Sequence, residues 1–461
     1  MRDWAGHILV LGLGASGEAA AEWALGQAES GASVRVTVVD SGTADQLAER
    51  AGRLRARGAR VLLGSDELPD ADLIVASPGI PPHSPLMRSA RAHGAPIISE
   101  IELAYRISRA PWVAVTGTNG KTTTTALVVH LLREAGFVAE PAGNIGPPAV
   151  RVAEEAGAAA IIVAEVSSFQ LGAIESFHPA VSVMLNVTPD HLDYHGSMEA
   201  YAADKARIFA NQLTGDVAVI DVDDPGAAAM VPIAEAKGVS VLRVSRTSSP
   251  SPGAYVREGM LVLDDGTSVT GVLPVAELAI KGDHNISNAL AAAAAVSAMG
   301  ADVASLRRGL GSFAPLEHRL EPAGVVDGVE FFNDSKATNP DAVAKALTAF
   351  QDRPVVLLLG GRNKGVDLTP LAALVAGRCK AVVLFGESAS EFAEALAHYE
   401  VERRQVSDVE SAVRAASELA SPGDVVVLSP GCTSFDEFTS YAERGRRFKA
   451  IVAGLAGRDP S

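Results

Sequence analysis

The amino-acid sequence predicts an α/β protein in which parallel sheets are covered by helices, built as three domains. Three observations carry this prediction. Short apolar runs recur along the chain, stretches of helical character separate them, and the length of 461 residues exceeds the roughly 300 residues that one hydrophobic core serves. The predicted strands are HILVLG, VRVTVVD, ADLIVAS, WVAVTG, AAIIVAE, VSVMLNV, PVVLLLGG, KAVVLFG and DVVVLSPG.

Two changes of pattern divide the chain. The helical stretch IELAYRISRA leads to Pro111 and a new strand, and FAPLEHRL follows the alanine-rich stretch NALAAAAAVSAMG. The segment TSSPSPG at 247–253 is interpreted as a surface loop inside the middle domain, because β-like pieces follow it without a new nucleotide loop. The predicted domains are therefore 1–99, 100–315 and 316–461.

The composition disfavours several classes of partner and leaves small anionic substrates possible. The net charge is −16 without a block of basic residues, which disfavours nucleic acid as a partner. No apolar run reaches the roughly 18 to 20 residues that a bilayer span needs, so no membrane insertion is expected. The N-terminus lacks a basic region followed by a cleavage site, which predicts a cytoplasmic location. The two cysteines, Cys379 and Cys432, cannot form a disulfide framework or a cysteine metal site.

A phosphate-binding loop is the strongest chemical signal. The strand WVAVTG runs into TGTNGKT and then into a helix. Gly117 and Gly120 allow backbone N–H groups to converge on phosphate oxygens, Lys121 supplies a cation, and the Thr122 hydroxyl can hold Mg²⁺. The strict Walker A pattern requires glycine where Val115 stands. The alternative is a glycine turn with a surface lysine.

Acidic and histidine side chains follow the next two apolar strands. Glu165 ends one strand, where a carboxylate can reach a metal bound beside the phosphate loop. Asp190, His191, Asp193 and His195 follow the other. A solvated strand-end acid, a polar turn with N-capping aspartates and a zinc site are the alternatives. Mg²⁺ beside a phosphate loop explains more of the pattern than zinc.

A second glycine loop opens the chain. Gly12, Gly14 and Gly17 have the GxGxxG spacing between a strand and a helix, and Asp40 ends the second strand. Alone, this pattern is typical of an NAD-dependent oxidoreductase, but the same geometry holds any diphosphate at a helix N-terminus. An oxidoreductase leaves the loop at 116–122 unexplained. A non-enzymatic P-loop switch or motor is the other alternative, and it predicts ATP hydrolysis without a second substrate.

The last domain carries polar residues at predicted strand ends. Asp334, Lys336 and Thr338 lie together in FFNDSKATNPDA, and Lys364 lies in the glycine loop LLLGGRNKGVD. Two lysines at strand ends suit a ligand with anionic oxygens. Solvated surface lysines are the alternative interpretation.

In this combination the whole chain resembles the Mur ligase family. The motifs that carry the resemblance are GLGASG (12–17), ADLIVASPGI (71–80), TGTNGKT (116–122), GNIG (143–146), EVSSFQL (165–171), NVTPDHLDYHG (186–196), GDHNISNALAA (282–292), NDSKATN (333–339), LGGRNK (359–364) and LSPGCTSFDEF (428–438).

The resemblance implies a Rossmann-like UDP-binding domain, a central P-loop-type ATPase domain with a parallel sheet, and a Rossmann-like C-terminal domain that binds an amino acid. The implied reaction is ATP-dependent amide bond formation that adds D-glutamate to UDP-N-acetylmuramoyl-L-alanine (UDP-MurNAc-L-Ala) through an acyl phosphate, in the synthesis of peptidoglycan precursors. It further implies two Mg²⁺ sites and a monomer. A sister ligase that adds a different amino acid is the alternative.

Site residues follow by matching the family motifs. The implied catalytic residues are Lys121, His191 and Lys205. The implied ATP contacts are Gly117, Thr118, Asn119, Gly120, Lys121, Thr122, Thr123, Asn285, Asn288, Arg319 and Asp334. The implied metal ligands are Thr122, Glu165, His191 and Lys205 as its carbamate. The implied UDP-substrate contacts are Gly14, Ala15, Ser16, Asp40, Ser41, Gly79, Asn144 and Ser167. The implied D-glutamate contacts are Lys336, Thr338, Lys364, Ser434 and Tyr441.

Three positions need comment. Lys205 matches a family lysine that is carbamylated, and a carbamate offers Mg²⁺ two anionic oxygens where an ammonium would repel it. Gly42 stands where relatives carry an arginine, which bears on the contact with uracil. Arg362 stands where an acidic residue can occur, which bears on the D-glutamate pocket.

Overall fold

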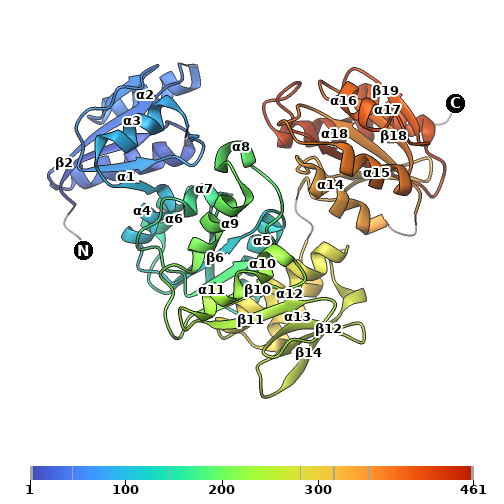
Figure 1. Ribbon diagram of the computed structural model, residues 1–461, viewed down its shortest axis with the longest axis horizontal. Coiled ribbons are helices and arrows are strands. Elements are labelled where there is room, and N and C mark those ends of the chain that lie inside the picture. Colours follow the sequence, from blue (N-terminus) through green and yellow to red (C-terminus); the bar gives the residue numbers. More distant parts are fainter. Residues whose placement is uncertain are drawn as a thin grey trace. The chain divides into compact units, whose positions relative to one another are not determined.

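The computed structural model describes residues 4–43, 45–81, 83–144, 146–280, 282–314, 317–350 and 353–457 (Figure 1). For residues 45, 46 and 193 it describes the backbone alone. The chain divides into two compact units. Unit 1 comprises 1–278 and 287–312, and unit 2 comprises 279–286 and 313–461.

The first sheet of unit 1 is all-parallel, in the order β3-β2-β1-β4-β5. Side chains of its central strand alternate between two cores: Ile8 and Val10 enter one, and Leu9 and Leu11 enter the other. The sheet is therefore buried on both faces. Its elements are β1 (Gly6–Leu11), α1 (Ala15–Glu29), β2 (Val34–Asp40), α2 (Asp45–Ala56), β3 (Arg60–Leu63), β4 (Leu73–Ala76), α3 (Pro85–His93) and β5 (Ile97–Ser99).

The second sheet of unit 1 has nine strands in the order β14-β13-β12-β11-β10-β9-β6-β8-β7. The strands from β7 across to β12 are parallel, and β13 and β14 extend the sheet in antiparallel fashion. The strands are β6 (Trp112–Thr116), β7 (Val138–Gly143), β8 (Ala160–Glu165), β9 (Val181–Met184), β10 (Val217–Asp221), β11 (Ser240–Ser245), β12 (Gly253–Arg257), β13 (Met260–Asp264) and β14 (Val269–Pro274).

Helices that bear on the site lie at the carboxyl ends of this sheet or cover its faces. Those used below are α4 (Glu100–Ile107), α5 (Lys121–Glu134), α6 (Ala149–Glu155), α7 (Ser168–Leu171), α8 (Leu192–His195), α9 (Met198–Ala206), α12 (Asp283–Ala298) and α13 (Val303–Ser312). The alanine-rich stretch of α12 is buried from Asn288 to Val296, where small side chains allow close packing. The remaining short helices are α10 (Pro225–Ala228) and α11 (Val231–Glu235).

The sheet of unit 2 has the order β15-β16-β20-β17-β18-β19, and only the pair β15-β16 is antiparallel. Its central strand β17 also sends alternate side chains into two cores. The elements are β15 (Glu321–Val326), β16 (Val329–Asn333), α14 (Pro340–Leu347), β17 (Val355–Gly360), α15 (Thr369–Arg378), β18 (Cys379–Phe385), α16 (Ala389–Ala395), β19 (Glu402–Gln405), α17 (Val409–Leu419), β20 (Val425–Gly431) and α18 (Tyr441–Ala456).

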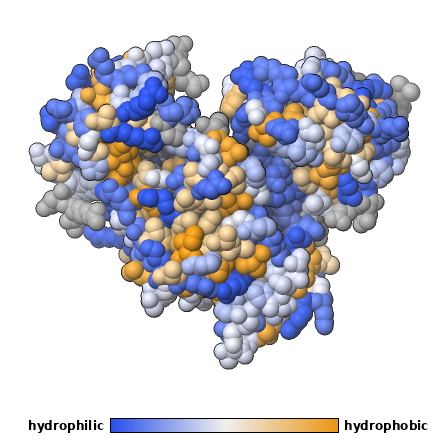
Figure 2. All heavy atoms as spheres, in the orientation of Figure 1, coloured by the Kyte–Doolittle hydropathy of each residue, from blue (hydrophilic) through white to orange (hydrophobic). Residues whose placement is uncertain are grey.

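The predicted fold class is confirmed, and all nine predicted runs contain strands. The strands of each sheet fall within one predicted domain, although both sheets of residues 6–274 belong to one compact unit. The boundary at 99/100 stays a prediction, and residues 315 and 316 lie outside the described part of the chain. On the face shown in Figure 2, hydrophilic and hydrophobic residues are interspersed. Among the described helices, none combines the length and apolarity needed to cross a bilayer.

Candidate active site

The phosphate loop connects β6 to α5 at the carboxyl edge of the nine-stranded sheet of unit 1, which is called the central sheet below. Gly120 has a φ of 84°, a left-handed conformation that favours glycine, and α5 begins at the next residue, Lys121. Asn186, after β9, holds the loop from the side: its Oδ1 accepts from the Asn119 amide at 2.8 Å, and its Nδ2 donates to the Asn119 carbonyl at 3.0 Å. The N-terminus of α5 is therefore presented as an anion site.

Two lysines meet at this loop. Lys121 Nζ donates to the carbonyl oxygens of Gly117 and Thr118 at 2.9 and 2.7 Å. Lys205 Nζ, from α9, donates to the same Gly117 oxygen at 2.7 Å and lies 4.6 Å from the centre of the Tyr201 ring. Two lysine amines therefore donate to one carbonyl oxygen of the loop backbone.

Lys205 is almost fully buried, with 1% of its surface exposed. Burial lowers the pKa of its amine well below the ordinary value, and the charge of Lys121 lowers it further. The negative charges of Asp190 and Glu165 oppose this effect. A larger fraction of Lys205 is therefore in the neutral amine form than for an exposed lysine.

Glu165, at the end of β8, is buried and joined to Asn144 at two points. The Asn144 amide donates to the Glu165 carbonyl at 2.9 Å, and Asn144 Nδ2 donates to Glu165 Oε1 at 3.0 Å. The other carboxylate oxygen, Oε2, is buried and has no hydrogen-bond partner among the described residues. A buried carboxylate oxygen without a donor suits a cation, so the residues fit a magnesium ion.

Asp190 and His191 follow β9 on the same edge. His191 adopts a left-handed backbone conformation with a φ of 52°, and its amide donates to Asp190 Oδ1 at 2.9 Å. Its Nε2 lies 3.7 Å from Asp190 Oδ2, and its ring contacts the edge of Phe169 at a centroid distance of 4.9 Å. Of Asp193 only the backbone is described, so its predicted role lies outside the described side chains.

The remaining predicted nucleotide residues fall on two units. Thr118 donates its hydroxyl to the Thr188 carbonyl at 3.0 Å, while Thr122 and Thr123 are buried in the first turn of α5. Asn288, on α12, packs so closely on Gly120 that a Cβ there would lie 2.4 Å from Asn288 Oδ1. The residues Asn285, Arg319 and Asp334 belong to unit 2.

Asp334 is a buried carboxyl at the end of β16. Burial raises its pKa to about 7, against the hydrogen bonds it accepts from Ser429 Oγ at 2.8 Å and the Leu320 amide at 3.3 Å and against the charge of Arg319. Arg319 Nε is itself buried without a hydrogen-bond partner among the described residues. This pair can offer polar groups to a ligand within unit 2.

The N-terminal glycine loop borders a cavity of about 430 Å³. The Asp40 carboxylate braces this loop by accepting from the Leu13 and Gly42 amides at 2.6 and 2.7 Å. A Cβ at Gly42 would lie 2.8 Å from the Leu47 side chain, so glycine suits the local packing. Six of the predicted UDP contacts line the cavity, namely Gly14, Ala15, Ser16, Asp40, Ser41 and Gly79. The other two, Asn144 and Ser167, lie on the central sheet edge, where Ser167 caps α7.

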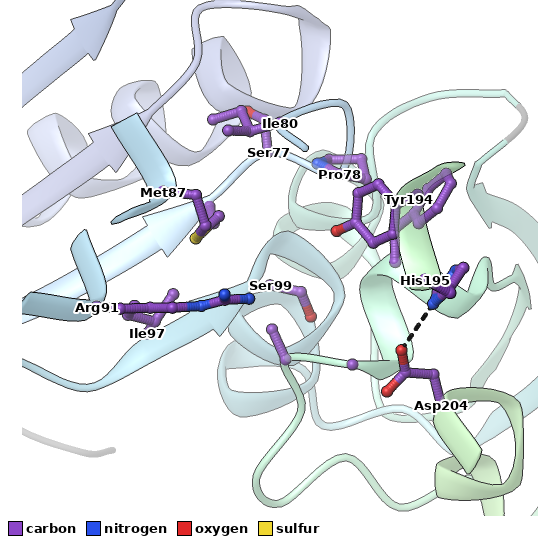
Figure 3. Close-up of a pocket in the computed structure, with 14 residues that line it drawn as sticks. Ser77, Pro78, Ile80, Met87, Arg91, Ile97, Ser99, Tyr194, His195 and Asp204 are labelled. Carbon is purple, nitrogen blue, oxygen red and sulfur yellow. Dashed lines mark hydrogen bonds and ion pairs between the residues drawn. The ribbon is translucent and has the colours of Figure 1, made fainter. Parts of the chain in front are cut away.

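A second cavity, of about 370 Å³, lies between the first sheet and the helices α7 to α9 of unit 1 (Figure 3). Arg91 from α3 and Ser99 from β5 line one wall of this cavity. Tyr194, His195 and Asp204 line the opposite wall. Burial raises the pKa of the Tyr194 phenol, so it is a hydroxyl donor at neutral pH.

The predicted D-glutamate residues lie on strand-end loops of unit 2. Lys336 Nζ is 5.3 Å from the centre of the Tyr441 ring, and Ser434 is buried. Thr338 is half-buried and Lys364 is exposed. The structure thus brings Lys336 and Tyr441 together.

Arg362, the unusual residue of this region, pairs with Glu387. Its Nε and Nη2 each lie 2.8 Å from a carboxylate oxygen, which is a bidentate arrangement on the surface. A basic residue at position 362 is therefore matched by a nearby acid.

Sequence reasoning missed Arg444. This residue of α18 is fully buried and donates to Ser335 Oγ, the Ser335 carbonyl and the Cys432 and Thr433 carbonyls at 2.9 to 3.2 Å. It ties the loop before Lys336 to the loop before Ser434. Burial lowers its pKa to about 10. In the sequence, GRRFK resembles an ordinary solvated helix face, so no local signal distinguishes it.

Comparison with known proteins agrees with this geometry. Residues 6–99 match the Mur ligase MurD-like N-terminal domain, residues 115–296 the Mur ligase middle domain, and residues 318–432 the Mur ligase glutamate ligase domain. A UDP-N-acetylmuramoylalanine--D-glutamate ligase of Pelotomaculum thermopropionicum is 44% identical over 452 residues, 97% of each chain. One of Salinibacter ruber is 45% identical over 394 residues, 84% of this chain and 85% of that one.

Solved structures share the fold at low identity. MurF from Acinetobacter baumannii has a TM-score of 0.62 at 17% identity, covering 92% of this chain and 91% of its own. The UDP-N-acetylmuramate-alanine ligase MurC from Thermotoga maritima has a TM-score of 0.60 at 19% identity, covering 97% and 99%. With three matched domains and full-length relatives of this identity, the chain belongs to the Mur ligase family.

Proposed function

We propose that this Mur ligase uses ATP to join D-glutamate to UDP-MurNAc-L-Ala, through an acyl phosphate, in the synthesis of peptidoglycan precursors. The names of its full-length relatives support the substrates. The observation that carries the chemistry is the phosphate loop, where Lys121 and Lys205 converge on the Gly117 carbonyl beside the buried carboxylate of Glu165. Residues 1–99 bind the UDP substrate, 100–315 bind ATP, and 316–461 bind the amino acid.

ATP binds with its phosphates at the N-terminus of α5. Residues 117–123 supply backbone amides and hydroxyls, and Lys121 turns from its two carbonyls toward the β and γ phosphates. Asn285, Asn288, Arg319 and Asp334 surround the rest of the nucleotide. The buried polar atoms of Arg319 and Asp334 support this role.

Thr122, Glu165, His191 and the carbamate of Lys205 would hold magnesium ions at two sites. The bound metal would supply positive charge that neutralises phosphate oxygens. Glu165 Oε2, which has no donor among the described side chains, supports this ligand set.

The carbamate of Lys205 forms when the neutral amine attacks CO₂: an N–C bond forms, one C–O π bond of CO₂ breaks, one proton leaves the nitrogen, and two oxygens share the single negative charge. Only the neutral amine has the lone pair for this step. Burial and the charge of Lys121 lower the pKa of Lys205, which supports the modification.

The reaction has two displacements. The alanyl carboxylate attacks the γ-phosphorus, ADP leaves, and an acyl phosphate forms. The amine of D-glutamate then attacks the acyl carbon, and the tetrahedral intermediate expels phosphate. His191, beside Asp190, is the candidate to accept the proton that the amine loses. Lys121, at the phosphate loop, supplies the positive charge that stabilises the negative charge developing on the transferred phosphate.

The substrates are held by the outer domains. Gly14, Ala15, Ser16, Asp40, Ser41 and Gly79 bind the UDP group, and Asn144 and Ser167 bind the muramoyl part; the shared cavity of the first six supports this assignment. Lys336, Thr338, Lys364, Ser434 and Tyr441 bind D-glutamate. The enzyme works as a monomer in the cytoplasm, where ATP is available.

Phosphate release tests this function. The purified chain is given ATP, Mg²⁺ and UDP-MurNAc-L-Ala, and each amino acid is added in turn. We expect stimulation by D-glutamate and little by L-glutamate, L-lysine or D-alanine. The Lys121→Ala variant is the control for a contaminating ATPase. Stimulation by another amino acid would assign a sister ligase, and release without any amino acid would indicate a P-loop switch.

A further inference from the structure

Three side chains of unit 1 form a hydrogen-bonded series that the proposed chemistry does not use. Ser168 Oγ lies 3.0 Å from His195 Nε2, and His195 Nδ1 lies 3.0 Å from Asp204 Oδ2. Figure 3 shows the second of these bonds at the wall of the 370 Å³ cavity. The residues come from α7, α8 and α9, and the His195 side chain is 1% exposed.

The chemistry of Asp204 fixes the direction of one bond. Its carboxylate can only accept, so His195 Nδ1 carries a proton. When the ring is neutral, Nε2 accepts and the Ser168 hydroxyl is the donor. One imidazole ring in the Nδ1–H tautomer then links three short helices.

The same three residue types form the nucleophilic triad of hydrolases, but here the serine is not placed for attack. Ser168 is 3% exposed and does not line the cavity that His195 and Asp204 border. Ser168 lies in the first turn of α7, where a hydrogen bond from its hydroxyl can hold the helix in place. The series therefore orients neighbouring groups.

Each member lies beside a residue of the proposed site. Ser168 follows Ser167, and Asp204 precedes Lys205. Phe169, next to Ser168, stacks on His195 at a centroid distance of 5.4 Å and contacts His191 at 4.9 Å. A shift of α7, α8 or α9 would thus move a substrate contact, the candidate base or the carbamylated lysine.

We infer that His195 is a positioning residue, which holds Ser167, His191 and Lys205 in their catalytic arrangement through its bonds to Ser168 and Asp204. The inference rests on the proposed function for the identity of these three. The phosphate loop is also held by Asn186, so loss of the His195 bonds should change kcat more than ATP binding.

Three substitutions separate the hydrogen bonds from the packing of the ring. His195→Phe keeps an aromatic ring and removes both bonds. His195→Asn places a donor near Nδ1 and retains the bond to Asp204, and His195→Gln places an acceptor near Nε2 and retains the bond to Ser168. We expect kcat to fall 10- to 100-fold in the phenylalanine variant, with KM for ATP within about twofold of wild type. The other two variants should fall between it and wild type.

His178→Phe is the matched control. His178 Nε2 lies 2.6 Å from Asp216 Oδ2, so this histidine–aspartate pair belongs to the same unit, but it precedes β9 and β10 at the opposite edge of the sheet. The control should lose thermal stability and keep kcat. If the phenylalanine variant at 195 is at least as active as the asparagine and glutamine variants, ring packing is sufficient and the inference is wrong.

A spectroscopic measurement keeps the inference separate from the proposed function. Long-range ¹H–¹⁵N spectra of the full chain should show His195 with a protonated Nδ1 and an unprotonated Nε2. Asp204→Asn should shift this population toward the other tautomer. A wild-type chain inactive with D-glutamate would refute the function, whereas an Nε2–H tautomer in the wild type would refute the hydrogen-bonded series.

Discussion

Lys121 and Lys205 donate to the same acceptor, the carbonyl oxygen of Gly117, at 2.9 and 2.7 Å. Two ammonium groups on one carbonyl repel each other, and Lys205 is the more buried of the two. The repulsion is relieved when Lys205 loses its proton, and it becomes an attraction when Lys205 becomes an anionic carbamate. The loop thus favours modification of one lysine and retention of charge on the other.

Carbamylation can be observed directly. In ¹³C-bicarbonate buffer, we expect a carbamate resonance in the wild type that disappears in Lys205→Arg, together with a loss of kcat of at least ~100-fold. Lys380→Arg is the control, because Lys380 pairs with Asp424 in unit 2 and should not change the signal. Persistence of the resonance in the Lys205 variant would assign it to another lysine.

Gly120→Ala should weaken ATP binding through two effects. The left-handed backbone costs about 1–2 kcal/mol for alanine, and the added methyl would lie 2.4 Å from Asn288 Oδ1, so that this side chain must shift. We expect KM for ATP to rise at least ~10-fold, since the loop amides shift. Gly136→Ala is matched: its φ is 86°, but no atom lies within 4 Å of the added methyl. Gly136→Ala should lower stability without changing KM for ATP. Equal KM values for ATP in the two variants would contradict the role of the contact between residue 120 and Asn288.

Glu100 predicts an unusual pH dependence of stability. Burial raises its pKa to about 7, against the hydrogen bonds from the α6 amides of Val150 and Ala149. The folded state therefore binds this proton more tightly than the unfolded state, and the contribution of Glu100 to stability falls as pH rises from 4.5 to 7. Glu100→Gln should remove this loss, so that its stability relative to wild type rises by up to about 3 kcal/mol over this range. Thermal midpoints measured across pH 4.5 to 8 test this.

The control lies two residues along α4. Burial tends to raise the pKa of Glu102, but hydrogen bonds from Ser176 and Arg106 outweigh burial and hold it below its ordinary value. Its contribution is therefore present above the unfolded pKa and lost as pH falls. Glu102→Gln should be most destabilising at neutral pH, opposite in trend to Glu100→Gln. Parallel pH trends in the two variants would refute the assignment.

Arg444→Met should separate the two loops that it joins. Its four hydrogen bonds hold Ser335 beside Cys432 and Thr433, so we expect unfolding free energy to fall by about 2–4 kcal/mol and KM for D-glutamate to rise at least ~10-fold. Arg447→Ala, on the exposed face of the same helix where Arg447 pairs with Glu410, should cost less than about 1 kcal/mol. A normal KM for D-glutamate in the methionine variant would restrict Arg444 to a stability role.

The sequence predicted those parts of the site that are local along the chain. Residues 112–122 contain a strand, a loop and the start of a helix within a few positions, and the backbone geometry of these elements forms the anion site. The same holds for Asp40, which ends β2 and braces the adjacent glycine loop. These patterns depend on spacing, and spacing is visible in a sequence.

Other parts depend on partners far apart in the chain. Arg444 bonds to Ser335, 109 residues away, and its burial follows from the packing of α18. His195 stood out as a candidate ligand, but its bond to Ser168 spans 27 residues and gives it a different role. Periodicity cannot show such pairings, because they arise only when helices from separate segments meet at one sheet edge.

The double attachment of Asn144 to Glu165 has a consequence for recombination between relatives. A Cβ at Gly143 would lie 2.4 Å from the Glu165 carbonyl, so the ends of β7 and β8 depend on each other's residues for their close approach. A chimaera with its crossover between residues 144 and 165 would take the end of β7 from one parent and the end of β8 from the other. Crossovers placed outside this interval inherit the strand ends as a pair, which makes them the productive choice for shuffling this enzyme with its homologues.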